Sequence, residues 1–130
     1  MEDCIFYKII KGELPSKTIY EDELIKVIMN INPTTNGHLL VLPKEHMVNI
    51  MDTTDEVIMH SIKVIRKLYP ELKEKLNCEG LTISQNNELG QEIKHFHIHL
   101  TPRYNNDLVD FNYNKDMIKD LDEVFNMINK

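Results

Sequence analysis

The chain has little cysteine and no long apolar run. Its only two cysteines, Cys4 and Cys78, are too few for a disulfide framework, so we expect both to be free thiols. No early apolar segment is long enough for a signal peptide or a membrane span, and the first residues are acidic. We therefore expect a cytoplasmic protein with no membrane partner.

Positive charge is also scarce. The 15 lysines and arginines are outnumbered by 21 aspartates and glutamates, which gives a formal net charge of -6. This balance argues against broad nucleic-acid binding, although it allows a local pocket for one phosphate group. The apolar share of 42% is ordinary for a globular protein, and there is no repeat, low-complexity tract or proline-rich linker. We predict one domain, 1–130, that binds no nucleic acid.

Four stretches have the character of β-strands. Residues 24–31 and 38–42 are rich in β-branched and apolar side chains and are bounded by proline or glycine, which predicts an antiparallel pair. Residues 81–84 and 95–100 are further candidates. Together with the helical segments described next, they predict an α+β fold.

Between these strands the apolar residues recur at steps of three and four, which predicts a helix. Thr53 and Glu56 have the spacing of a capping box, so the helix should begin near residue 54. Pro70 should kink or break it after Tyr69, and Gly80 is placed to end the segment.

From Asn114, a plausible N-cap, the tail has the pattern of a second amphipathic helix. We expect its apolar stripe to pack on the chain's own sheet or on a partner subunit rather than to bind a partner peptide. We divide the chain into a core, 1–104, and a C-terminal helical extension, 105–130. The stripe consists of Met117, Ile118, Leu121, Val124, Phe125 and Ile128.

The most informative stretch is His95-Phe96-His97-Ile98-His99-Leu100. On a β-strand the two-residue period puts the three imidazoles on one face and the apolar residues on the other. Three interpretations are open from the residues alone. The imidazoles bind a metal ion, with help from ligands elsewhere because His95 and His99 are too far apart to share one ion. Alternatively one imidazole attacks phosphorus while its neighbours hold the phosphate oxygens, or the row is a polar face under solvent.

The segment from Gly90 to Arg103 resembles the signature of the histidine-triad family, in which three histidines alternate with apolar residues. The resemblance extends upstream through residues 5–16, 20–22 and 32–46, and so covers nearly residues 4–104 in the expected order. It implies a five-stranded antiparallel sheet with a long helix, a homodimer, and a site for a purine nucleotide substrate. It also implies transfer of a nucleotidyl group onto histidine, followed by hydrolysis, without a cofactor.

Roles for the histidines follow from the resemblance. It implies that His97 is the nucleophile, that His99 binds the α-phosphate, that His38 belongs to a relay and that His95 is structural. The attacking imidazole must be neutral, so its other nitrogen needs an acceptor that fixes the proton there. Backbone carbonyls near Gly37 and His38 are candidates for this acceptor.

The nucleotide contacts are expected mainly from the first half of the chain. Apolar residues there either form a wall against the base or pack in the core, and both interpretations are open. Asn30 stands where many relatives hold the ribose with aspartate, and it keeps an acceptor oxygen. Asn86, with Asn87 as an alternative, and the amides from Gly90 to Glu92 would lie on the phosphate side. The predicted nucleotide-binding residues are Phe6, Ile9, Asn30, Ile31, Asn86, Gly90, Gln91 and Glu92, and Ile28 joins the apolar wall.

Two positions depart from the family's pattern. Some relatives bind a structural zinc with a Cys-x-x-Cys pair, but here the residue three positions after Cys4 is Tyr7. One thiolate together with His46 leaves too few ligands, so we predict no structural zinc. Glu92 stands where relatives usually have serine or threonine. A carboxylate there would repel a polyphosphate leaving group and would raise the pKa of His97, unless it is turned to solvent.

We therefore predict a nucleotidyl hydrolase or transferase of the histidine-triad type. The alternative is a nucleotide-binding module with little turnover, in which catalysis has been lost through Glu92 and through the loop from Asn86 to Gly90, which is shorter than the usual loop of the family. A histidine-dependent metal enzyme is a third possibility.

Overall fold

The computed structural model describes residues 3–129, which form a five-stranded antiparallel sheet, three helices and a short 3₁₀ turn. In space the strands follow the order β1-β2-β3-β5-β4, so the chain crosses from β3 to the edge strand β4 and returns to the middle as β5. This confirms the α+β fold that the sequence predicts. The strands are β1 (Thr18–Glu21), β2 (Ile25–Met29), β3 (Leu39–Pro43), β4 (Gly80–Ser84) and β5 (Ile98–Arg103).

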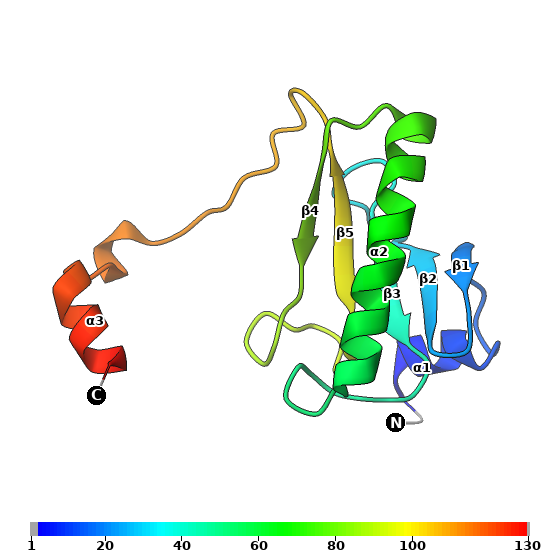
Figure 1. Ribbon diagram of the computed structural model, residues 1–130, viewed down its shortest axis with the longest axis horizontal. Helices are drawn as coiled ribbons and strands as arrows, with labels where there is room; N and C mark the ends of the chain where they lie inside the picture. The colour runs from blue at the N-terminus through cyan, green and yellow to red at the C-terminus, as the bar shows by residue number, and fades with distance from the viewer. Residues whose placement is uncertain (1–2, 130) are drawn as a thin grey trace.

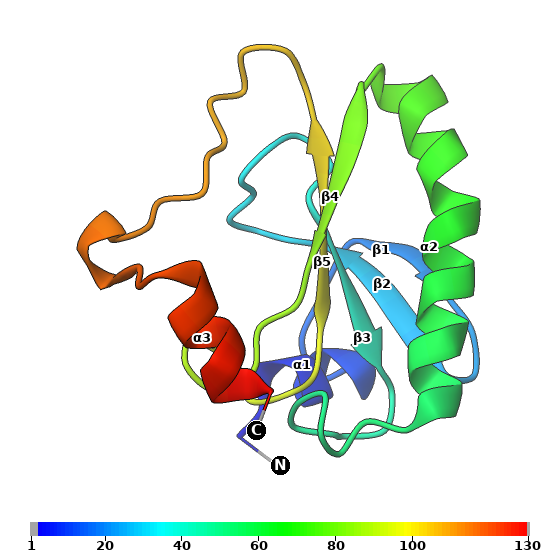
Figure 2. The ribbon, with the colours of Figure 1, turned by 60° about the vertical axis from the view of Figure 1, so that its left-hand side comes forward.

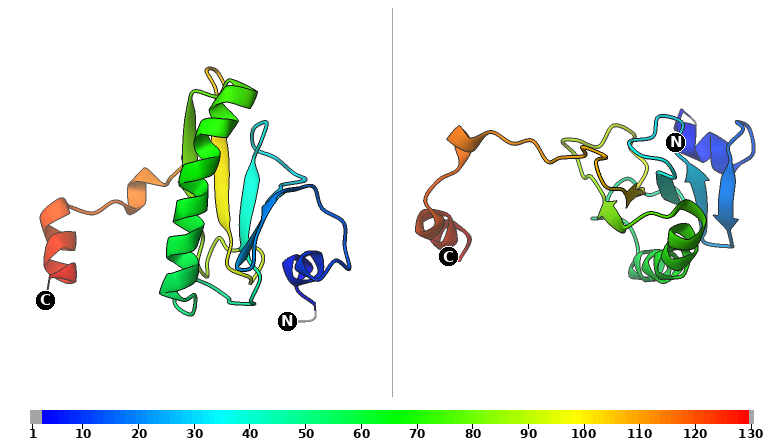
Figure 3. Two further views of the ribbon diagram at one scale, coloured as in Figure 1. Left: turned by 45° about the vertical axis from the view of Figure 1, so that its right-hand side comes forward. Right: turned by 90° about the horizontal axis from the view of Figure 1, so that it is seen from above.

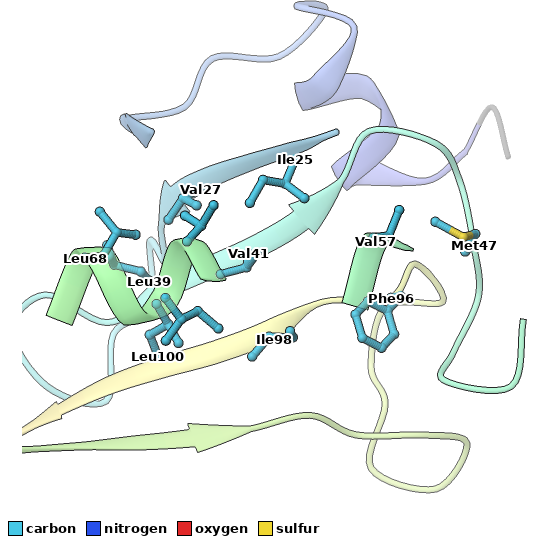
Figure 4. Packing of buried hydrophobic residues seen from close by; sticks show 12 residues of the cluster. Ile25, Val27, Leu39, Val41, Met47, Val57, Leu68, Phe96, Ile98 and Leu100 are labelled. Atoms are coloured by element: carbon cyan, nitrogen blue, oxygen red, sulfur yellow. The ribbon is translucent and has the colours of Figure 1, made fainter. Parts of the chain in front are cut away.

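One face of the sheet is covered by α2 (Asp55–Leu76), which lies along it (Figure 1). The alternation of side chains sends every second residue of β2, β3 and β5 into this layer, where they pack against Val64, Ile65 and Leu68 of the helix. Figure 4 shows the packing, with Val57, Met47 and Phe96 gathered near the start of α2. The sheet residues of this core are Ile25, Val27, Leu39, Val41, Ile98 and Leu100.

The same alternation turns the remaining strand residues to the opposite face. Here the short helix α1 (Ile5–Ile10) packs Phe6 and Ile9 against Ile28, Leu40 and Leu42. Figure 2 shows α2 on one side of the sheet, and the left view of Figure 3 shows α1 on the other. Since α1 has six residues, it covers only part of its face, and the rest is left to the histidines of β5 and its approach.

The ends of α2 differ from the sequence prediction. Thr54, not Thr53, is the N-cap, and its hydroxyl accepts a hydrogen bond from the amide of Val57. The helix continues through Pro70, and the turn that ends it is made by Asn77 in the left-handed region (φ 56), not by Gly80, which lies in β4. The predicted break at Pro70 and stop at Gly80 are therefore wrong.

The physical reason is the place of Pro70 on the helix. Pro70 and Arg66, whose carbonyl loses its usual partner, are both exposed, so water can take the place of the missing amide. Beyond the proline, Leu72 packs against the core and Leu76 lies so close to Gly37 that a β-carbon there would clash with it. Packing at the far end thus holds the helix together across the proline.

The C-terminal extension also differs from the prediction. Asn114 caps only a 3₁₀ turn, η1 (Lys115–Met117), and the helix α3 begins later, at Leu121, and ends at Ile128. The stripe does not pack on the chain's own sheet, because none of the residues of α3 is buried (Figures 1 and 3), and packing on a partner subunit, the other expectation, stays a prediction. Within residues 3–129, no helix has the length and apolar character needed to cross a membrane.

Asp22 joins the β1–β2 turn to α2. Its carboxylate accepts hydrogen bonds from the amides of Leu24 and Ile25, from the hydroxyl of Tyr20 at 2.7 Å and from Nε2 of His60 on α2 at 2.5 Å. Burial opposes ionisation of Asp22, but these hydrogen bonds outweigh it and hold the pKa of the carboxyl well below its usual range. The ionised form of Asp22 therefore stabilises the fold.

We predict that Asp22→Asn lowers the free energy of unfolding by about 1–3 kcal/mol at neutral pH, the range for hydrogen bonds to a charged group. Because the folded-state pKa is depressed, the contribution of Asp22 is full above the unfolded-state pKa of about 4 and is lost as the pH falls below it. The difference between wild type and variant should therefore shrink in acid. Urea unfolding at a series of pH values measures it, with the exposed neighbour change Glu23→Gln as control, and a difference that does not vary with pH would contradict the assignment.

Candidate functional site

A cleft of about 630 Å³ opens on the α1 side of the sheet. Its walls come from α1, from β2 and the loop after it, from β3 and β5, and from the loop before His95. The sequence missed several of these residues, among them Thr34 and Ile93, which carry no chemical signal of their own. The predicted site residues that line the cleft are Phe6, Ile9, Asn30, Ile31, His38, Asn86, Gly90, Glu92, His97 and His99. Gln91 and His95 lie outside it.

The three alternating histidines are not a row on one strand. β5 begins only at Ile98, and His95 and His97 belong to the segment that leads into it. This segment is held by the amide of Phe96, which donates to the carbonyl of Met47 at 2.7 Å rather than to a neighbouring strand. His97 and His99 remain side by side in the cleft, with ring centroids 5.0 Å apart, whereas the ring of His95 is fully buried. The predicted strand face of three imidazoles is therefore wrong.

The orientation of His97 follows from one hydrogen bond. Its Nδ1 lies 2.7 Å from the backbone carbonyl of His95, which can only accept, so Nδ1 carries the proton. Nε2 then has a lone pair, and it has no partner among the described residues and is not buried, so it opens to the cleft. The acceptor is thus His95 itself, and the expectation of a carbonyl near Gly37 or His38 is wrong.

The lowered pKa of His97 also favours the neutral form, in which Nε2 can accept a bond. Burial lowers its pKa, while the hydrogen bond to His95 and the negative charge of Glu92 raise it, and the net result lies below the usual histidine value. Glu92 therefore acts in the expected direction but does not dominate. At neutral pH the imidazole is uncharged.

His38 and His99 form a second chain of hydrogen bonds. The amide of Thr34 donates to Nδ1 of His38 at 3.0 Å, so the proton of His38 is on Nε2, 2.9 Å from Nδ1 of His99. His99 must then accept on Nδ1 and carry its own proton on Nε2, which is the nitrogen left open to the cleft. His38 thus orients His99 and does not bond to His97.

Both members of this chain are neutral. Burial lowers the pKa of His38, and burial with the nearby His97 and His38 lowers the pKa of His99 to about 4. The cleft accordingly presents an imidazole acceptor on His97 and an imidazole donor on His99, side by side. This pair can attack an electrophile with one ring and hydrogen-bond its oxygen with the other.

The ring of His95 belongs to a separate cluster behind the cleft. Its Nε2 donates to the carbonyl of Pro43 at 2.8 Å, and its Nδ1 lies 3.0 Å from Nδ1 of His46 and 3.6 Å from Sγ of Cys4. Burial is the main reason why the pKa of His95 is lowered to about 4. Cys4 and Cys78 are both free thiols.

Cys4, His46 and His95 could hold a metal ion, because one ligand atom of each lies within 4.8 Å of the others. A structural zinc site uses four protein ligands. The side chain at position 7 lies beside His46, with ring centroids 6.3 Å apart, but it is tyrosine. The structure adds His95 to Cys4 and His46, the two donors that the sequence argument counted, and the three fall one short of the four protein ligands of a structural zinc site.

The remaining predicted residues differ in what they offer to a ligand. Phe6 is buried beneath the cleft and meets the ring of His97 edge-on, whereas Ile31 is 88% exposed at its rim. Asn87 is occupied, because its side-chain oxygen accepts from the amide of Ile50 and the side chain of Gln85. Asn86 lines the cleft, so the geometry favours Asn86 over Asn87 as the ligand residue.

Gln91 supports the loop and does not face the cleft. It is buried, its side-chain nitrogen donates to the carbonyl of Val48, and its amide donates to the carbonyl of Glu88. Its backbone amide is therefore not available to a phosphate. Glu92, the next residue, is exposed and lies between the cleft and a shallower hollow beside Cys4 and His46.

We predict that the purified protein holds no stoichiometric zinc, because the donor set lacks a fourth ligand. The Tyr7→Cys variant should gain stoichiometric zinc, since position 7 lies beside His46 and its amide already bonds to the sulfur of Cys4. Elemental analysis after dialysis against a weak chelator checks both, with Tyr69→Cys on α2 as a control for an added thiol. A full equivalent of zinc in the wild-type protein would overturn the prediction.

Comparison with known proteins places the chain in a family. The HIT domain model matches residues 11–106. An uncharacterised HIT-like protein of Methanocaldococcus jannaschii is 43% identical over 129 residues, which cover 96% of this chain and 98% of that protein. The adenosine 5'-monophosphoramidase of Saccharomyces cerevisiae is 34% identical over 77% of this chain and 62% of its own length. A Streptococcus mutans crystal structure has a TM-score of 0.87 at 34% identity and covers 99% of this chain and 83% of that one. With a matching family model over most of its length and the same fold, this chain belongs to the histidine-triad (HIT) family.

Proposed function

We propose that this protein is a nucleotidyl hydrolase or transferase that cleaves purine nucleoside 5'-monophosphate esters or phosphoramidates through a covalent intermediate on His97. The observation that carries the proposal is the hydrogen bond from Nδ1 of His97 to the carbonyl of His95, which leaves the Nε2 lone pair open to the cleft. A neutral imidazole with a free lone pair is the form that attacks phosphorus. The yeast relative, named an adenosine 5'-monophosphoramidase, supports this reaction class.

In the first step Nε2 of His97 forms a bond to the α-phosphorus as the bond from phosphorus to the leaving nitrogen or oxygen breaks. The leaving group takes a proton from solvent at the open end of the cleft. The modified imidazole is now cationic, because it carries phosphorus on Nε2 and a proton on Nδ1. The carbonyl of His95, 2.7 Å from Nδ1, stabilises this charge as it develops.

In the second step water adds to phosphorus and loses a proton, and the bond to Nε2 breaks. A nucleoside monophosphate leaves, and His97 returns to its neutral form. In both steps Nε2–H of His99 donates to a non-bridging phosphate oxygen, and His38 keeps that proton on Nε2 by donating to Nδ1. No cofactor or metal ion takes part in the scheme.

The nucleoside occupies the part of the cleft formed by α1 and β2. Phe6, Ile9 and Ile31 form an apolar wall for a base, and Asn30, with Asn86 and the Gly90 region on the phosphate side, supplies polar contacts. The amide oxygen of Asn30 accepts from the amide of Asn32 at 2.9 Å and keeps lone-pair capacity for a ribose hydroxyl. The preference for purines rests on the family resemblance.

Glu92 selects the leaving group. Glu92 is exposed and lines the cleft. Its negative charge lies near His97 and raises the pKa of that histidine. A carboxylate there repels a polyphosphate leaving group and accepts hydrogen bonds from an amine. We therefore propose that phosphoramidates and small leaving groups are preferred over dinucleoside polyphosphates.

The working form proposed for this enzyme is a cytoplasmic homodimer. The edge of β4 away from β5 has no strand partner within residues 3–129, which leaves its backbone groups available for a second chain.

His97→Ala should abolish turnover of an adenosine phosphoramidate, with a loss of at least about 10³-fold, and should change nucleotide affinity only modestly. Rapid quenching of the wild-type reaction and intact-mass spectrometry should show one added nucleotidyl group, and peptide mapping should locate it at residue 97. His60→Ala on α2 is the control for loss of an imidazole. Wild-type protein that binds nucleotide but neither turns over nor forms the adduct would instead support the binding-module alternative.

Glu92→Ser should raise kcat/KM for a dinucleoside tetraphosphate by about tenfold, the effect of removing one nearby like charge. The difference in kcat/KM between this substrate and an adenosine phosphoramidate should therefore become smaller. Glu88→Ser, on the same loop but outside the residues that line the cleft, is the matched control. Faster cleavage of the tetraphosphate than of the phosphoramidate by the wild-type protein would contradict the assignment.

Glu92→Gln tests the same contact through pH. Removing the negative charge lowers the pKa of His97, so the acid limb of kcat/KM should move to lower pH. An unchanged acid limb would mean that the carboxylate acts too far from the ring.

A further inference from the structure

The cleft has an acidic side chain at one end only. Among the described residues that line it, Glu92 is the only acidic one, and its charge acts on His97. Where β2 ends, the polar residues of the lining are all neutral, and they are Ser16, Asn30, Asn32 and Thr34. The two ends of the cleft should therefore respond differently to a negatively charged part of a ligand.

The contacts of the histidine rings give the order of these groups along the cleft. Nδ2 of Asn30 lies 3.5 Å from Nε2 of His38. The ring centroids of His38 and His99 are 5.2 Å apart, and those of His99 and His97 are 5.0 Å apart. Glu92 comes next, where the cleft borders the second hollow. The histidines thus stand between the neutral end and the acidic end.

The orientation of the Asn30 side chain is fixed by the backbone. Its Oδ1 accepts from the amide of Asn32 at 2.9 Å, and because an amide N–H can only donate, the opposite end of the group is Nδ2. Nδ2 faces Nε2 of His38, but that nitrogen carries a proton and donates it to His99. Two N–H groups do not bond to each other. The hydrogens of Nδ2 are therefore left for an acceptor in the cleft.

Two neighbours add to the donors at this end. Thr34 is exposed and brings a hydroxyl group to the lining of the cleft. Lys17 lies beside the end of β2, because its carbonyl accepts from the amide of Met29 at 2.9 Å. Lys17 is exposed, and its long flexible stem gives the ammonium group a wide reach. Hydrogen-bond donors and one positive charge thus lie near Asn30, and the lining there has no carboxylate among the described residues.

We propose that this end of the cleft binds a second phosphate group, esterified to a ribose hydroxyl, so that the enzyme accepts nucleotides phosphorylated on the sugar as well as at the 5' position. The inference rests on the proposed function, because it requires a nucleotide whose α-phosphate lies on His97 and His99. The ribose is joined to that phosphate through a single methylene carbon, so its hydroxyls lie close to the histidines, on the side of Asn30. Phosphate oxygens only accept hydrogen bonds, and they match the donors of Asn30 and Thr34.

The amide at position 30 determines this tolerance. An aspartate would have nearly the same shape, but both of its oxygens would accept, which suits hydroxyl groups and repels a phosphate. The asparagine removes that charge and replaces one acceptor by a donor. At the other end of the cleft Glu92 keeps its carboxylate. A second phosphate is therefore accepted on the sugar and opposed in a polyphosphate chain.

The test is equilibrium binding of four nucleotides to the full chain: AMP, ADP, adenosine 3',5'-bisphosphate and adenosine 2',5'-bisphosphate. ADP and the bisphosphates have the same number of phosphates and differ in where the second one stands. We expect at least one bisphosphate to bind as tightly as AMP or more tightly, and more tightly than ADP. If AMP binds but both bisphosphates bind more weakly than AMP or than ADP, this inference is wrong and the proposed function stands. If AMP does not bind, both are wrong.

A matched pair of variants assigns the effect to one residue. Asn30→Asp should raise the ratio of the Kd of the bisphosphate to the Kd of AMP by at least about tenfold, the effect of one like charge near a protein surface. Asn36→Asp makes the same change in the same loop but outside the lining of the cleft, so solvent screens it and the ratio should stay within about twofold. An unchanged ratio in Asn30→Asp would contradict the role of Asn30. The wild-type affinities decide the proposal even if that variant does not fold.

Discussion

The candidate site depends on the peptide unit of His95. Its side chain is anchored by the carbonyl of Pro43 at the end of β3, and its own carbonyl receives the Nδ1 proton of His97. The two bonds tie the segment before β5 to the end of β3, so the sheet helps to fix the position of the His97 ring although this residue lies outside the strand. A residue outside the cleft therefore determines which nitrogen of His97 carries the proton and which one opens to the cleft, and the ring of that residue is completely buried.

A second chain of bonds gives the neighbouring ring the opposite property. It begins at the amide of Thr34, which can only donate, and each following nitrogen is then fixed as acceptor or donor until His99 is left with a proton facing the cleft. Low pKa values keep all of these imidazoles uncharged, since burial outweighs every contact that favours the charged form. The neutral ring of His97 thus offers a lone pair, and the neutral ring of His99 offers a hydrogen-bond donor. An attack on a phosphoryl group requires the first of its nucleophile and the second of the group that binds the phosphate oxygen.

The sequence predicted the parts of this arrangement that depend on local pattern. The β-branched and apolar side chains of residues 25–29 and 39–42, with the proline and glycine that bound them, identified these strands, which are buried along most of their length. The prediction failed where distant contacts decide. β5 begins only after His97, because the amide of Phe96 donates to the carbonyl of Met47 and not to a neighbouring strand. The helix α2 continues beyond Pro70, because Leu72 and Leu76 make packing contacts near its C-terminal end. Asn77 and Gly80 are both suited to a left-handed turn, and only the start of β4 at Gly80 decides between them. The carbonyl that fixes His97 has no sequence signal at all, since every residue has one.

The neutral histidines also make the charge of Glu92 important for the substrate preference that we propose. A cleft without positive charge binds phosphate by hydrogen-bond donors alone, so it offers little to offset repulsion from a carboxylate at its mouth. In the proposed complex, a single phosphoryl group bound by His99 would lie away from the mouth and tolerate that carboxylate, whereas a chain of phosphates that leads outward would pass beside it. In the proposed function, the substrate range is therefore set by a balance between burial, which keeps the histidines neutral, and the exposed carboxylate of Glu92.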